Sequence, residues 1–223
     1  MNSQKINEHY KTLAPDLISN GAYYDLHILE NFVKKHYSPS SKPLAMAVGF
    51  SITNEAGIIK NFHKIAYGIP IEDSKVFGCT LVQSSDIKGI VKDYNYVMYG
   101  NDGDALDDFT WVRPFLIGNF EPDDYDFIYI RNPDILNAPR LDAWKGIILR
   151  ANDHLKPEGL ITVVVRESDS GKYHTLLDML NRDAGMKPIV SEPAGIEYKN
   201  KHSMFEDFHH TVGVFRKSNN LND

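Results

Sequence analysis

The feature that most constrains the fold is an alternation of short apolar runs with segments of helical periodicity. Residues 44–50 are apolar apart from one glycine, and the segment after them carries apolar side chains at helical spacing. Further runs at residues 75–82, 96–99, 125–130 and 160–165 are expected to form strands, because such runs are typical of strands buried on both faces. The alternation predicts a doubly wound, mostly parallel sheet with right-handed crossovers and helices on both faces.

The two ends of the chain add to this picture. The helical spacing of apolar side chains before the turn-rich residues 38–43 predicts an N-terminal helical cap over residues 1–40. The last two predicted strands are at residues 188–191 and 211–215, and too few residues follow the second one to form a crossover helix. We therefore expect a seven-stranded sheet with an antiparallel edge strand in a domain over residues 41–217, followed by a disordered tail at residues 218–223.

Two glycines mark predicted helix ends. The helical pattern of residues 141–155 is broken by the sequence KPEG at residues 156–159, which leads into the strand at 160–165. Gly159 is expected to adopt a left-handed conformation past the helix, since glycine reaches it without steric cost. Gly185 is expected to do the same after the helix at residues 173–183.

Charge and composition exclude several kinds of function. The net charge of -6 disfavours broad contact with a nucleic acid backbone, and no apolar run is long enough to cross a membrane. The single cysteine, Cys79, excludes an internal disulfide and fits a cytoplasmic protein. No metal site is expected, because the nine histidines show no helical H-x-x-x-H pair and the acids near residue 104 lack calcium-loop spacing. The predicted partners are small molecules or proteins, with no prediction of oligomeric state.

Three motifs in the second half resemble those of one family. The sequence YDFIYIRNP at residues 125–133 is similar to the fourth strand of class I S-adenosylmethionine-dependent methyltransferases. LKPEGLITV at 155–163 resembles the turn into their fifth strand, and LNRDAGM at 180–186 resembles the helix end before their sixth strand. The resemblance extends from about residue 40 to residue 217 and implies a Rossmann-like domain that binds S-adenosylmethionine.

The family's glycine-rich loop after the first strand is degraded in this chain. The resemblance assigns Gly49, Phe50 and Ser51 to the cofactor, but only one glycine remains, and Ala47 stands where the family has an acid. Glu55 is a candidate for supplying the lost negative charge near the cofactor's amino group. The alternative is that Glu55 lies in the first turn of a helix and favours its dipole.

The resemblance places the nucleoside of the cofactor at the next two strand ends. Thr80, with Leu81 beside it, occupies the position of the acid that binds the ribose hydroxyls. A hydroxyl cannot accept two charge-assisted bonds as a carboxylate does, so weaker binding is expected. Asp104, supported by Ala105, is expected to accept the adenine amino group, unless this segment is only a polar turn.

Arg131 and Asn132 follow the fourth strand, where methyl donor and acceptor would meet. Their motif lacks the second proline and the aromatic residue of the amino-methylating branch of the family. A charged Arg131 is consistent either with an anionic substrate or with a salt bridge to the N-terminal cap, and the salt bridge is the commoner use.

The function expected from the resemblance is transfer of a methyl group to a small-molecule or peptide nucleophile. The acceptor pocket is predicted between the N-terminal cap and the loop of residues 194–208, and no catalytic residue is assigned. The alternative, motivated by the missing glycines and ribose acid, is a catalytically inactive methyltransferase-like binding or assembly module.

Overall fold

The computed structural model describes residues 3–17, 20–49, 55–80, 96–99, 124–131, 133, 135, 138–166, 170–194 and 210–217. The helices are α1 (Ser3–Leu13), α2 (Asn20–Ile28), the π-helical turn η1 (Leu29–Val33), the 3-10 turns η2 (Lys34–His36) and η3 (Ile71–Asp73), α3 (Glu55–Tyr67), α5 (Ala138–Asp153) and α6 (Ser170–Ala184). The strands are β1 (Leu44–Gly49), β2 (Lys75–Thr80), β3 (Tyr96–Tyr99), β4 (Tyr125–Arg131), β5 (Leu155–Arg166), β6 (Val190–Pro193) and β7 (His210–Arg216).

The strands form one sheet in the order β3-β2-β1-β4-β5-β7-β6. Strands β1 to β5 pair in parallel, whereas β7 is antiparallel to both β5 and β6. The antiparallel strand lies second from one edge, so antiparallel pairing is confined to that side of the sheet. The prediction of a mostly parallel α/β sheet is confirmed.

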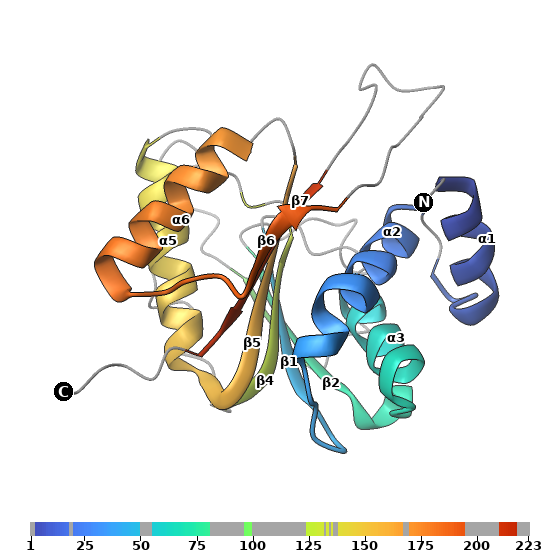
Figure 1. Ribbon diagram of the computed structural model, residues 1–223. Helices are drawn as coiled ribbons and strands as arrows, with labels where there is room; N and C mark the ends of the chain where they lie inside the picture. The colour runs from blue at the N-terminus through green and yellow to red at the C-terminus, as the bar shows by residue number, and fades with distance from the viewer. Residues whose placement is uncertain are drawn as a thin grey trace.

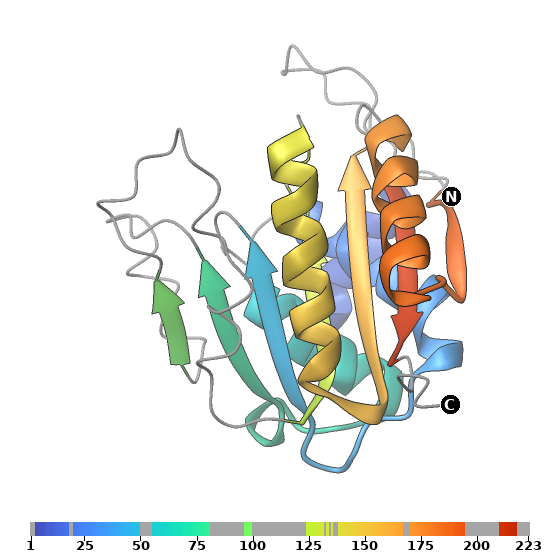
Figure 2. The ribbon, with the colours of Figure 1, turned by 90° about the vertical axis from the view of Figure 1, so that its left-hand side faces the viewer.

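Helices cover both faces of this sheet (Figure 1). On one face α2 and α3 share a hydrophobic cluster with the side chains of Ala45, Phe127 and Val164. On the other face α5 and α6, seen in front of the strands in Figure 2, pack on a second cluster that includes Ile128 and Val163. Alternate residues of one strand therefore belong to opposite cores, which explains why β4 and β5 carry apolar side chains on both faces.

The predicted N-terminal helices are present in residues 3–36 and lie on the α3 face of the sheet (Figure 1). Helix α1 packs on α2, and α2 packs on α3. Side chains from all three helices, such as Ile6, Leu26 and Phe62, are fully buried in the same cluster. The N-terminal segment thus shares its core with the sheet.

The KPEG segment differs from the prediction. Helix α5 ends at Asp153, and Leu155 already belongs to β5, where it pairs with Tyr125 of β4. The next pair between the two strands is Phe127 with Leu160, so β5 accommodates the KPEG residues as an irregularity of its register. The segment therefore lies within a strand, where it disturbs the pairing with β4.

The left-handed conformation expected at Gly159 is also wrong. The described glycines with positive φ are Gly68 and Gly185, at 70° and 63°. A Cβ at Gly159 would lie 2.8 Å from the carbonyl oxygen of Tyr125, so the close approach of β4 explains this glycine. The prediction for Gly185 is confirmed: its N–H donates to the carbonyl of Asn181 at 2.9 Å after the end of α6.

Several predicted segments lie outside the described residues. They are the helix expected from residue 85, the last two residues of the strand predicted at 75–82, nearly all of the loop at 194–208, and the tail at 218–223.

Candidate functional site

The carboxyl ends of β1, β2 and β3 lie side by side at one edge of the sheet. Gly49 pairs with Thr80, and Thr80 pairs with Tyr99, so the last residues of the three strands are in register. The strand order reverses between β1 and β4, because the chain proceeds from β1 to β2 and β3 and then returns to β4 on the other side of β1. In open α/β sheets such a switch point is where ligands bind.

Strand β4 contributes Arg131 to this edge. Val48 of β1 pairs with Ile130, and Arg131 is the next residue and the last of β4. Its side chain is 23% exposed, and its Nε lies 2.8 Å from Oδ2 of Asp25 in α2. Its Nη1 lies 3.4 Å from Oε1 of Glu55, the first residue of α3. The salt bridge to the N-terminal helices that we considered for Arg131 is therefore confirmed.

The two carboxylates in this cluster are almost completely buried. Side-chain exposure is 1% for Asp25 and 5% for Glu55. Burial raises the pKa of Asp25 to about 6, since a charge loses its hydration there; Arg131 opposes the rise, and Glu55 adds to it. Asp25 in turn raises the pKa of Arg131 above its ordinary value. Two acids thus contact one guanidinium.

The structure thus brings together four of the predicted site residues, in two pairs. Gly49 and Thr80 meet at the ends of β1 and β2, and Glu55 and Arg131 contact each other. Glu55 lies in the first turn of α3, which was the second of the two alternatives considered for this residue. The other predicted site residues lie outside the described part of the chain: Phe50, Ser51, Leu81, Asp104, Ala105 and Asn132.

The sequence analysis did not assign a role to Asp25 or Tyr129. Asp25 is flanked by buried residues of α2, including Tyr24 and Leu26. Tyr129 is fully buried in β4, and its hydroxyl lowers the pKa of Asp25, which favours the ionised carboxylate. An acid inside an otherwise apolar helical stretch was the available signal, because such an acid is rarely buried without a partner.

A second polar cluster lies at the amino ends of the strands. Nδ1 of His63 is 2.7 Å from Oγ of Ser74, and Nε2 is 3.3 Å from the hydroxyl of Tyr37. His63 and Ser74 are at most 2% exposed, and burial lowers the pKa of His63 to about 4. The serine and histidine have the contact of a nucleophile and its base, but they lie in the core at the edge opposite the switch point. This cluster is structural.

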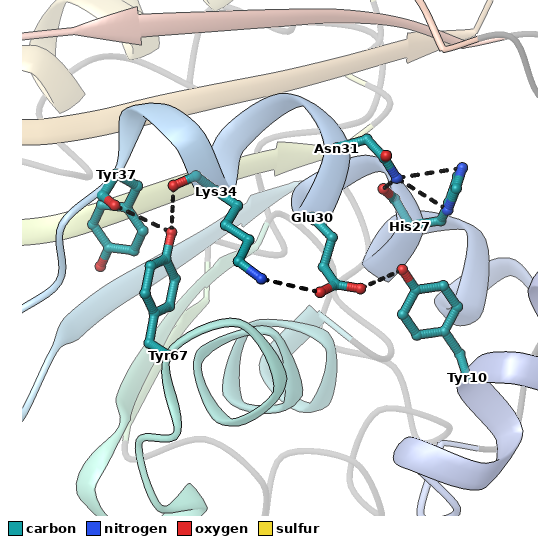
Figure 3. A network of polar contacts seen from close by, with 7 residues as sticks. All are labelled: Tyr10, His27, Glu30, Asn31, Lys34, Tyr37 and Tyr67. Atoms are coloured by element: carbon teal, nitrogen blue, oxygen red, sulfur yellow. Dashed lines mark hydrogen bonds and ion pairs between the residues drawn. The ribbon is translucent and has the colours of Figure 1, made fainter.

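Polar contacts also fasten the N-terminal helices (Figure 3). The Tyr10 hydroxyl of α1 donates to Oε2 of Glu30 at 2.6 Å, and Glu30 faces Lys34 at 3.7 Å. The Tyr67 hydroxyl of α3 donates to the carbonyls of Lys34 and Tyr37. These contacts join α1 and α3 to the turns that follow α2.

Two further properties hold for the described residues. No helix there combines the length and the apolar character needed to cross a membrane. No group of three or more histidine, cysteine or acidic side chains there is arranged to hold a metal ion.

The fold matches solved structures of methyltransferases, although no protein family matches the sequence and no curated protein does. A methyltransferase from Pyrococcus furiosus is 12% identical with a TM-score of 0.54, over 96% of this chain and 98% of its own. A Listeria monocytogenes protein assigned to the class I S-adenosylmethionine-dependent methyltransferases is 10% identical with a TM-score of 0.54, over 100% and 70%. The plantazolicin methyltransferase BpumL, in complex with SAH, is 10% identical with a TM-score of 0.50, over 97% and 89%. The sheet order and these matches together give the chain the fold of the class I S-adenosylmethionine-dependent methyltransferases.

Proposed function

We propose that the chain is an S-adenosylmethionine-dependent methyltransferase that acts on a small-molecule or peptide nucleophile. The observation that carries the proposal is the sheet order β3-β2-β1-β4-β5-β7-β6, with its switch point between β1 and β4. Matches over nearly the whole chain to methyltransferases, one of them bound to SAH, support it. With one cysteine in 223 residues, a cytoplasmic location is part of the proposal.

The proposed site departs from the family's pattern at two described positions. Ala47 of β1 stands where the family has an acid, and it is fully buried in the core. At the second position the family's carboxylate would bind both ribose hydroxyls, whereas Thr80 offers a single hydroxyl. We therefore expect this chain to bind the cofactor about tenfold more weakly, or weaker still, than a chain with the acid. We propose that Asp104 and Ala105 hold the adenine, with the remaining contacts from Phe50, Ser51, Leu81 and Asn132.

The chemistry asked of the protein is modest. S-adenosylmethionine, when bound, supplies an electrophilic methyl group on a sulfonium. The chain has to align an acceptor with it, and such alignment contributes up to about 7–11 kcal/mol in ideal cases. A general base is needed only if the acceptor carries a proton when it attacks. We name no catalytic residue.

The second candidate is a methyltransferase-like module that no longer carries out catalysis. Two observations favour it: Ala47 stands where an acid is expected, and the charges of Glu55 and Arg131 are directed at each other. For such a module, the switch point would bind a protein or another ligand, and neither Glu55 nor Arg131 would contact a cofactor.

Calorimetric titration with S-adenosylmethionine and S-adenosylhomocysteine separates the candidates. We expect binding that weakens in Asp104→Ala and that tightens about tenfold in Thr80→Asp, which restores the ribose acid. Thr175→Asp is the matched control, because Thr175 is exposed on α6, away from the proposed site. Absence of binding at millimolar ligand would reject the methyltransferase proposal in favour of the inactive module.

A further inference from the structure

The guanidinium of Arg131 connects three elements beside the switch point. Its Nε faces Asp25 of α2, and its Nη1 faces Glu55 of α3. The third nitrogen, Nη2, lies under the first turn of α2, since a Cβ at Gly21 would be 3.2 Å from it. All three nitrogens thus face the helices that cover one face of the sheet.

A gain in stability is a weak explanation for this arrangement. Removing two carboxylates and a guanidinium from water costs several kcal/mol for each ion in general, and apolar replacements of such groups are often neutral or stabilising. The 2.8 Å contact between Asp25 and Arg131 also lacks the alignment of a hydrogen bond. Strongly perturbed groups of this kind are concentrated at functional sites.

The position of the cluster connects it with the proposed ligand edge. Val48 and Ile130 pair across β1 and β4, and the residues that follow them are Gly49 and Arg131. The backbone of Arg131 therefore lies next to the end of β1, from which the proposed cofactor loop departs. The only described link from the N-terminal helices to Arg131 is the one made by α2.

We propose that Asp25 is a positioning residue for the cofactor: through Arg131, its carboxylate holds α2 against the carboxyl end of β4 and thereby sets the geometry of the switch point. This inference rests on the proposed function. Asp25 acts through Arg131 and need not touch the ligand.

The ionisation of Asp25 provides a readout that a merely structural contact would not give. Among the described residues, the charged and titratable groups facing it are Arg131 and Tyr129 of β4 and Glu55 of α3. Its pKa of about 6 means that Asp25 loses its charge as the pH falls through 6. The hold on Arg131 weakens in the same range, so cofactor affinity should fall with it.

The experiment measures S-adenosylhomocysteine affinity of the full chain by calorimetry between pH 5 and pH 8. We expect wild-type affinity to fall below pH 6, and Asp25→Asn to bind about tenfold more weakly at pH 7.5 with a flattened profile. Tyr129→Phe removes the hydroxyl that lowers the pKa of Asp25, so it should move the midpoint to higher pH. Glu30→Gln is the control, because Glu30 belongs to the same N-terminal helices but contacts Tyr10 and Lys34.

The outcomes separate the two ideas. If wild-type protein does not bind at any pH, the proposed function fails, and the positioning role fails with it. If wild-type protein binds but Asp25→Asn keeps the wild-type affinity and profile, the positioning role alone is overturned. Should Asp25→Asn not fold, an unchanged midpoint in Tyr129→Phe overturns the role, and a raised midpoint supports it.

Discussion

Replacing Gly159 by alanine tests why the KPEG segment ends in glycine. The alanine Cβ would lie 2.8 Å from the carbonyl oxygen of Tyr125 and 3.1 Å from that of Lys156. Both neighbours are backbone atoms, so the strand pair has to separate by several tenths of an ångström to restore ordinary contact. Overpacking of this kind costs about 1–3 kcal/mol. In a chain of this size that corresponds to about 2–4 °C in Tm for each kcal/mol.

The competing explanation is that Gly159 needs a left-handed backbone, and asparagine separates the two. Asparagine tolerates the left-handed region better than alanine does, but its larger side chain makes a close approach worse. We expect Gly159→Asn to lower the free energy of unfolding at least as much as Gly159→Ala does. Urea unfolding, with the slope m compared among variants, measures this difference.

Gly185 is the matched control for this pair of variants. Its φ is +63°, and no atom lies within 4 Å of where a Cβ would be. The order should therefore reverse there, with Gly185→Ala costing about 1–2 kcal/mol and Gly185→Asn less. A Gly159→Asn variant more stable than Gly159→Ala would refute the close-approach explanation.

Three further predictions concern buried polar contacts. Burial lowers the pKa of His63 to about 4, so the unfolded chain takes up this proton first, and the fold loses about 3 kcal/mol of stability as the pH falls from 6.5 to 4. His63→Gln should lack that loss in acid unfolding curves. Asp126→Ala should cost about 1–3 kcal/mol in urea unfolding, because the backbone N–H of Leu44 that donates to Asp126 at 2.8 Å loses its acceptor. Tyr10→Phe should cost about 1 kcal/mol in thermal unfolding, since the hydroxyl donates to Glu30.

The sequence predicted the strands well because their pattern has one physical cause. Residues 44–49, 96–99 and 125–130 are strands as expected. Helices cover both faces of β1 and β4, so their residues are nearly all apolar; within residues 125–130 the exception is Asp126, which accepts a hydrogen bond from the N–H of Leu44. The predicted end of α5 was wrong by two residues. Leu155 has the spacing of a helical residue, but it pairs with Tyr125 in the sheet, and this distant partner determines its conformation.

The residues of the candidate site were harder to predict from the sequence than the strands were. Arg131 could be identified as a charge at the end of a strand, and a salt bridge to the N-terminal helices could be expected from base rates. Its partner could not be chosen among the acids of that segment, because the choice depends on how α2 lies on the sheet. Asp25 is selected by its place on the buried face of α2, which only the packing of α2 on α3 reveals.

The residues that determine the fold are different from those that would hold a ligand. The sheet order is stabilised by buried side chains in the middle of the strands, such as Ala45, Ile128 and Val163, which pack on helices from both faces. A ligand at the switch point would contact strand ends and loops, which lie apart from those residues. A chain can therefore keep the methyltransferase sheet while its ligand affinity falls, so the structural match and the binding titration test different residues. Under the proposed function, Thr80→Asp would restore one ligand contact, and it changes none of the core residues named above.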